Sequence, residues 1–318
     1  MLLLNILIFV IALVILGFAS RFTMKGSLYL LTLTRVSDYT IAFFLIGLAA
    51  AIPEIFIVIF SSLFGVPGLS FGNIIGANIA ALTLSLGLPA YFSQGLKIDN
   101  HFSKKTFWAT VLLGLLPTIV SLDGLIGRTD GILLIIIFCL YSWVVLMGMK
   151  FISMAVSAIP FSVFHIKEAV KTFKKNAIGH ILLLLSTAFL VIASINISQF
   201  YSISPVSFGV IFLGLATTLP KLFLNTEAGV LRNPSIIMGT VLGGIAINST
   251  AVLGLLAVIS PVRINVDPFN ILLNGLFLLT IFLLFRTLAY TGKRVSQAEG
   301  ILLAFIYVLF FISQLYFF

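Results

Sequence analysis

One stretch of this chain occurs twice, and that repetition limits the fold more than any other feature of the sequence. A single offset of 167 residues aligns residues 47–90 with residues 214–257 without a gap. The aligned identities include Gly47 with Gly214, Pro53 with Pro220, Phe56 with Phe223, Pro67 with Pro234, Gly72 with Gly239, Gly76 with Gly243 and Gly87 with Gly254. An internal repeat of this kind indicates one structural unit that is used twice.

The composition predicts that both copies lie in a membrane. Hydrophobic residues make up 61% of the chain and charged residues 8%, whereas soluble domains carry about 25% charged residues. The single cysteine, Cys139, excludes a disulfide framework and a cysteine-based metal site. No His/Asp/Ser or metal-ligand pattern in the sequence favours an enzyme. The net charge of +9 is explained by basic cytoplasmic loops better than by nucleic-acid binding.

The apolar segments are long enough to cross a bilayer many times. A spanning helix needs about 20 mostly apolar residues. By that measure the sequence predicts ten spans, near residues 2–20, 39–63, 69–93, 105–122, 129–149, 179–199, 204–230, 235–260, 268–288 and 299–318. We therefore expect an all-α polytopic membrane protein.

The ten predicted spans divide into two repeats of five. The start of the fifth span, Asp130-Gly-Ile-Leu-Leu134, matches the start of the tenth, Glu299-Gly-Ile-Leu-Leu303. An odd number of spans per repeat inverts the second copy in the bilayer, as in secondary transporters that bind their substrate near the midplane. The predicted units are a first repeat over residues 1–149, a basic linker over 150–178 and an inverted second repeat over 179–318.

Lysine and arginine predict the orientation in the membrane. Fifteen of them lie in loops that follow the odd-numbered spans, and only Arg128 and Arg263 lie in loops on the other side. Because basic loops stay in the cytoplasm, we expect both termini outside, the 150–178 linker in the cytoplasm and a plasma or inner membrane location. Lys221 is the remaining basic residue, and it lies inside a predicted span.

A proline followed by an ionisable residue marks the centre of each repeat, as Pro53-Glu54 and Pro220-Lys221. A helix-interior proline frees a backbone carbonyl, and matched helix breaks in two repeats point to a transport site. A charge in the hydrocarbon costs at least about 2.5–3.5 kcal/mol, so we expect Glu54 and Lys221 to pair across the pseudo-two-fold axis. Simple proline kinks and a purely structural ion pair are the alternatives.

Neutral polar side chains inside the spans complete the candidate site. At this depth amides and hydroxyls need partners, so they either line the site or join helices by hydrogen bonds. The glycines spaced four apart beside them predict close helix packing. The candidate ion- or substrate-binding residues are Glu54, Lys221, Thr217, Thr218, Asn248, Asn78, Asn73 and Thr240, with helix breaks at Pro53 and Pro220 and with Glu54 as the single metal-binding candidate.

The first repeat reads Gly47-x-Ala-x-x-x-Pro53-Glu54 and then Gly72-Asn-Ile-Ile-Gly76-x-Asn78, and it resembles the sodium/calcium exchanger (cation/Ca2+ antiporter) family. The resemblance covers both repeats and implies a ten-helix antiporter in which a glutamate from each repeat binds Na+ and Ca2+ alternately. It also implies an altered site, because Lys221 stands where the second glutamate is expected. Other family ligand positions carry Ala50, Ala51, Ala77, Ala81, Gly244, Ile245 and Asn248.

Together these features predict a secondary active transporter of the exchanger type, without enzymatic activity or a cofactor. Ca2+ prefers 6–8 oxygen ligands, carboxylates among them. A site with one carboxylate and one ammonium therefore favours coupling to protons, to one monovalent cation or to an anionic solute. Na+, H+ and Ca2+ are the candidate transported or coupling ions, the lipid bilayer is the expected partner, and the oligomeric state stays open.

A membrane enzyme that acts on lipid is the least favoured alternative, because no His/Asp/Ser or metal-ligand pattern supports it. Two further alternatives remain for the function. One is a genuine Ca2+/cation antiporter in which the side chain of Lys221 swings away or loses its proton. The other is a non-transporting membrane scaffold that has lost its ion site, a reading that the alanines at ligand positions favour.

Overall fold

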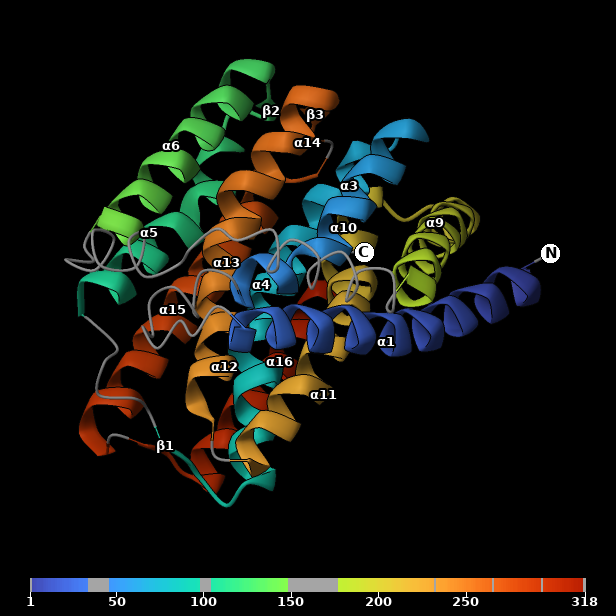
Figure 1. The fold of residues 1–318 in the computed structure, drawn as a ribbon. Helices are drawn as coiled ribbons and strands as arrows, with labels where there is room; N and C mark the ends of the chain where they lie inside the picture. Colours follow the sequence, from blue (N-terminus) through green and yellow to red (C-terminus); the bar gives the residue numbers. More distant parts are fainter. Residues whose placement is uncertain are drawn as a thin grey trace.

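The computed structural model describes residues 2–33, 46–97, 104–147, 177–231, 233–264, 266–292 and 294–316. In these ranges the chain is a helical bundle with a short strand pair at each of two opposite ends (Figure 1). The predicted linker 150–178 lies outside the described residues, apart from its last two positions at the start of a helix.

The first repeat contains five helices with assigned bounds and a short helical stretch over 46–50. Among the described helices of the whole chain, seven are long and apolar enough to cross a membrane, and two shorter apolar ones cover Ile52–Leu63 and Phe107–Val120. The total of ten spans stays a prediction. The first-repeat helices are α1 (Leu2–Leu33), α3 (Ile52–Leu63), α4 (Pro67–Phe92), α5 (Lys104–Val120) and α6 (Arg128–Met147).

The second repeat is built on the same plan, but π-helical segments interrupt its helices three times. In a π segment each backbone N–H bonds to the carbonyl five residues earlier, and such segments occur often at functional sites. The order is α9 (Ala177–Phe200), α10 (Pro205–Phe208), η1 (Gly209–Leu213), α11 (Gly214–Val230), α12 (Pro234–Met238), η2 (Gly239–Gly243), α13 (Gly244–Ile247), η3 (Asn248–Val252), α14 (Leu253–Ile259), α15 (Pro268–Gly292) and α16 (Gln297–Tyr316).

Proline and glycine encode the tight reversal between α3 and α4. Gly65 adopts a φ of 71°, a left-handed conformation that glycine takes without strain. Pro67 then begins α4, at a position where its missing N–H costs no intrahelical hydrogen bond. The same device begins α10, where Pro205 follows Ser204 and the Ser204 hydroxyl caps the helix by accepting from the N–H of Ser207 (3.1 Å).

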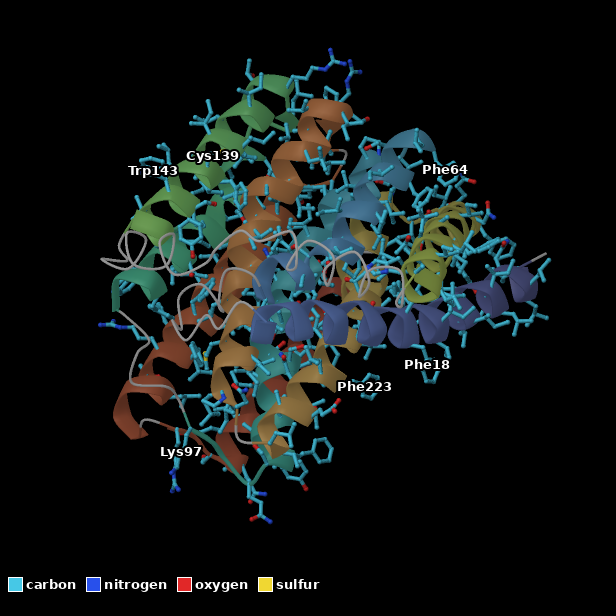
Figure 2. All side chains as sticks on the ribbon, in the orientation of Figure 1. Phe18, Phe64, Lys97, Cys139, Trp143 and Phe223 are labelled. Carbon is cyan, nitrogen blue, oxygen red and sulfur yellow. The ribbon has the colours of Figure 1, made fainter. Side chains whose placement is uncertain are left out.

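Two antiparallel strand pairs join the repeats at the ends of the bundle. Strand β1 (Leu96–Lys97) pairs with β4 (Arg294–Val295), and β2 (Leu125–Ile126) pairs with β3 (Val262–Arg263). Each pair takes one strand from each repeat, so the two pairs are related by the internal symmetry. At the β1–β4 end Lys97 points away from the helices (Figure 2).

The closest contacts between helices follow the same symmetry. A Cβ atom added to Gly214 would lie 2.7 Å from the Cα of Gly76, and one added to Gly47 would lie 2.7 Å from the carbonyl carbon of Gly243. The offset of 167 residues that aligns the repeats exchanges these two pairs. The predicted packing role of the glycines is therefore confirmed at both crossings.

Helix α4 lies at the centre of the bundle, and 89% of the residues in its most apolar stretch are buried. It packs against α11, η1 and α16. Large apolar side chains such as Phe18 of α1 and Trp143 of α6 are exposed on the outer helices (Figure 2). In a membrane protein this outer surface faces lipid, so the polar residues buried at the centre must satisfy one another.

Candidate functional site

The helix before the candidate site is interrupted at Ala51, two residues before Pro53. Residues 46–50 are helical, Ala51 forms a turn, and α3 begins at Ile52 with Pro53 in its first turn. Glu54 therefore also lies in the first turn of α3. The positive end of the helix dipole stabilises a carboxylate at such a position. The interruption therefore covers one residue, Ala51, and lies two residues before the predicted position at Pro53.

The break predicted at Pro220 is wrong, because α11 continues through this proline from Gly214 to Val230. Proline has a φ that fits a helix, and its main cost is one lost hydrogen bond. Two hydroxyl side chains of the preceding turn bond to a different carbonyl from the one that Pro220 leaves without an N–H, which is that of Ala216. Thr217 and Thr218 both donate to the carbonyl oxygen of Gly214, at 3.3 and 2.7 Å. The irregular segment lies earlier in the chain, in η1.

Glu54 and Lys221 form a buried ion pair. The ammonium Nζ of Lys221 donates to Oε1 of Glu54 and joins α11 to α3. Relative exposure is 0% for Glu54 and 3% for Lys221. The other carboxylate oxygen, Oε2, is buried and has no hydrogen-bond partner among the described residues. The pairing predicted from the repeat is confirmed, and one carboxylate oxygen remains free to accept a proton or a cation.

A second link joins α4 to α11 one helical turn before Lys221. The hydroxyl of Thr217 donates to Oδ1 of Asn73 at 3.0 Å, and both residues are buried. Thr217 and Lys221 are four residues apart and so lie on one face of α11. In the described part of the chain, the hydroxyl of Thr218, in contrast, bonds within its own helix, to the carbonyl of Gly214. The structure thus brings Asn73 and Thr217 together beside the turn that carries Lys221.

A third cluster joins α4 to η3. The amide of Asn78 donates to the hydroxyl of Ser249 (2.8 Å) and accepts from the amide of Asn248 (3.4 Å). Oδ1 of Asn248 is buried without a partner in the part of the chain that the structure describes. Segment η3 packs against α3, α4 and α5. This cluster therefore borders the helix of Glu54 and offers neutral oxygen ligands.

Thr240, predicted to belong to the site, instead bonds to a residue that the sequence reasoning missed. Its hydroxyl donates to Oδ1 of Asn225, and Nδ2 of Asn225 donates to the backbone carbonyl of Ser85 (3.1 Å). Asn225 is completely buried. Its position four residues after Lys221, on the same helix face, is the signal that could have found it.

The donor set of this region is poor for a divalent metal ion. Among the residues whose burial is described, Glu54 and Lys221 are the only buried charged side chains. No group of three or more His, Cys, Asp or Glu side chains able to hold a metal ion occurs in the described ranges. The family ligand positions Ala50, Ala51, Ala77 and Ala81 add only buried methyl groups.

Comparison with known proteins agrees with this architecture. The model of the sodium/calcium exchanger protein family matches residues 4–147 and 176–316. An uncharacterized membrane protein of Methanocaldococcus jannaschii is 26% identical over 311 residues, which is 97% of this chain and 97% of that protein. The putative antiporter CaxA of Alkalimonas amylolytica is 24% identical and matches over 87% of this chain and 89% of its own length.

Solved structures of the sodium-calcium exchanger NCX_Mj have the same fold. The form soaked with 10 mM Na+ and no Ca2+ superposes with a TM-score of 0.69 at 22% identity, covering 98% of this chain and 99% of that one. The form soaked with 2.5 mM Na+ and 10 mM Sr2+ gives a TM-score of 0.70 with the same identity and coverage. The predicted fold, a polytopic membrane protein with two repeats, is confirmed.

Proposed function

Since this chain belongs to the sodium/calcium exchanger family, we propose that it is a secondary active antiporter whose ion site has been altered by a built-in cation, the ammonium of Lys221. Members of the family are transporters and not enzymes, and their ions are substrates. Alternating access in this protein moves a small cation past Glu54 while Lys221 occupies the position of a second cation.

The buried ion pair between Glu54 and Lys221 carries this proposal. Two unit charges about 4 Å apart interact by about 4 kcal/mol at an effective dielectric constant of about 20. A divalent ion beside Glu54 would meet twice that repulsion from the Lys221 ammonium, and it would find few of the 6–8 oxygen ligands that Ca2+ prefers. A proton or one monovalent cation meets less repulsion and needs fewer ligands.

The free oxygen atoms support a site for a single positive charge. Oε2 of Glu54 and Oδ1 of Asn248 are both buried without a partner in the described part of the chain. Thr217 and Asn73 contribute neutral groups one helical turn from Lys221. Asn78 contributes an amide that is bonded to η3, and η3 packs against α3, the helix of Glu54. We propose that Glu54 takes up the proton or the monovalent cation and that these neutral groups complete its coordination. An anionic solute that binds to Lys221 is the second form of coupling open to this site.

A flux screen in proteoliposomes tests the proposal. Radiotracer or fluorescent-probe fluxes of Na+, K+, H+, Ca2+ and small anions are measured for the unaltered protein and for Glu54→Gln and Lys221→Ala. We expect each variant to lower the flux of the transported ion at least about tenfold, the effect of about 1.4 kcal/mol on a barrier. The matched control is Cys139→Ser, at an exposed position outside the site. Unchanged transport in both variants would overturn the proposal.

A substitution that restores the family pattern separates the rival readings. In Lys221→Glu the second glutamate returns, and we expect Ca2+-dependent flux to appear or to increase. If the unaltered protein already carries Ca2+ as well as Lys221→Glu does, the genuine Ca2+/cation antiporter is the correct reading. If neither carries any ion of the screen, the non-transporting scaffold is favoured, in agreement with the buried Ala50, Ala51, Ala77 and Ala81.

We further propose that the β1–β4 end of the bundle is cytoplasmic and that both termini lie outside, in a plasma or inner membrane. Lys97 and Arg294 are exposed at this end, and the distribution of basic loops supports the orientation. Protease accessibility of terminal tags on intact cells tests it. Tags that are cleaved only after the cells are lysed would overturn the orientation.

A further inference from the structure

Two polar links cross from α4 to α11, one on either side of the buried ion pair. Along α11, Thr217 contacts Asn73 before Lys221, and Asn225 contacts the carbonyl of Ser85 after it. Along α4 the order is the same, Asn73 before Ser85. Between the two links, Glu54 and Lys221 are sealed, with 0% and 3% relative exposure.

The second link depends on a proline in α4. In a regular helix the carbonyl of Ser85 would accept from the N–H of residue 89, but residue 89 is a proline inside α4 and has no N–H. Nδ2 of Asn225 supplies the missing donor at 3.1 Å. A carbonyl buried in a membrane protein needs such a partner, so the α4 sequence creates an acceptor that only another helix can satisfy.

Thr240 holds Asn225 in the orientation that this bond requires. Its hydroxyl donates to Oδ1 of Asn225, the nearer of the two acceptors within reach of its single hydrogen, and the carbonyl of Ile237 lies 3.0 Å away as the second. With Oδ1 accepting from Thr240, Nδ2 is directed at Ser85. One buried amide therefore ties together α11, α4 and η2 on the side of Lys221 toward which α11 ends, the β1–β4 end of the bundle (Figure 1).

We propose that Asn225 is a positioning residue that acts as the latch on this side of the ion site. While its two hydrogen bonds hold α11, α4 and η2 together, the path from the β1–β4 end to Lys221 is closed. When they break, α11 separates from α4 at this end while the Thr217–Asn73 link keeps the other end shut. The latch deepens the proposed alternating access and rests on it, but its test needs no transported ion.

The test measures the accessibility of cysteines on either side of the ion pair. In a Cys139→Ser background, Ala228→Cys reports on the β1–β4 end and Ser70→Cys reports on the opposite end, because both native residues are buried. A membrane-impermeant thiol reagent is applied from each side of reconstituted vesicles. We expect Asn225→Leu to raise the labelling rate of Ala228→Cys about three- to tenfold, the effect of losing a hydrogen bond, and to leave Ser70→Cys unchanged.

Two matched variants of α4 make the result specific. Ser85→Ala removes the hydroxyl but keeps the backbone carbonyl, so labelling must stay as in the unaltered protein. Pro89→Ala gives the Ser85 carbonyl an N–H from its own helix, so it should raise the labelling of Ala228→Cys and add little in the Asn225→Leu background.

Distinct outcomes separate the failure of the latch from the failure of the transporter. Equal labelling rates in Asn225→Leu and Ser85→Ala would overturn the latch, and so would an equal rise at both reporters, which indicates general loosening. Neither outcome bears on the flux of Glu54→Gln and Lys221→Ala, which alone decides the proposed function.

Discussion

The same glycine-rich segment takes two different forms in the two repeats. In the first repeat it is α4, an uninterrupted α-helix over Pro67–Phe92. In the second repeat it is divided by two π-helical segments, η2 and η3, between Pro234 and Ile259. An alignment without gaps therefore does not guarantee equal local geometry. The first repeat supplies a regular scaffold, and the second supplies the irregular turns, which place Asn248 and Ser249 against α4.

The chemical contributions of the repeats differ as much as their geometry. The first repeat contributes the carboxylate of Glu54 and the amides of Asn73 and Asn78, and the second contributes the Lys221 ammonium and the Thr217 hydroxyl. The side-chain hydrogen bonds described for Glu54, Asn73 and Asn78 all join one repeat to the other. The site is therefore a complementary pair of unlike halves, although its framework is symmetric.

The largest expected loss of stability comes from breaking the Glu54–Lys221 ion pair, the contact in which the two repeats differ most. Glu54→Leu leaves the Lys221 ammonium buried without a partner, and we expect a loss of about 3–5 kcal/mol in the free energy of unfolding. The double variant Glu54→Leu with Lys221→Met removes both charges and should recover most of that loss. Chemical unfolding in one detergent measures both, with Asp123→Asn on the exposed loop as the control. A double variant no more stable than Glu54→Leu would contradict the ion-pair account.

Replacing a glycine at either helix crossing should lower the stability by a smaller amount, and the loss should be equal in the two repeats because the glycine contacts are symmetric. Gly214→Ala and Gly47→Ala each place a Cβ within 2.7 Å of facing backbone. Overpacking of this kind costs about 1–3 kcal/mol, and thermal unfolding should register it in both variants. Gly244→Ala is the matched control, because a Cβ there meets nothing within 4 Å. A loss in one variant without the other would show that the two crossings are not equivalent.

The smallest expected loss of stability is found by comparing substitutions at two adjacent threonines of the second repeat, Thr217 and Thr218. Thr217→Val removes the donor to Asn73 on the other repeat, and we expect a loss of about 1 kcal/mol. Thr218→Val removes a bond within α11 alone and should cost less. The same unfolding assay compares the two variants. Equal losses would mean that the bond between repeats adds nothing beyond the bond within one helix.

The Glu54–Lys221 pair and the glycine crossings could be predicted from the sequence, because residues that align in an internal repeat occupy equivalent positions around the symmetry axis. The offset that superposes Glu54 on Lys221 also places them near one axis, and the structure pairs them. The Gly76–Gly214 and Gly47–Gly243 contacts follow from the same offset. These features depend only on which residues occupy the aligned positions of the two repeats, and a single sequence gives that information.

The missed features depend on backbone geometry. Asn225 bonds to the Ser85 carbonyl, which is available because of a proline on another helix, and no spacing within α11 reveals that partner. The helix continues through Pro220 because donors and packing in the folded protein decide whether a proline breaks a helix or only bends it. The π segments η2 and η3 are likewise a property of how the second repeat packs, since the first-repeat residues aligned with these two segments lie in the regular α-helix α4.

The ion pair also has a consequence for the response of the protein to membrane voltage. An elementary charge that crosses the whole potential changes its energy by about 2.3 kcal/mol per 100 mV. Glu54 and Lys221 are bonded to each other, and together they carry no net charge. Under the proposed function, the unloaded site would therefore change its exposure without moving charge through the field, and each monovalent cation that it loads would bring one full charge with it. A binding site with two carboxylates would have the reverse property, because it would be most sensitive to voltage when empty.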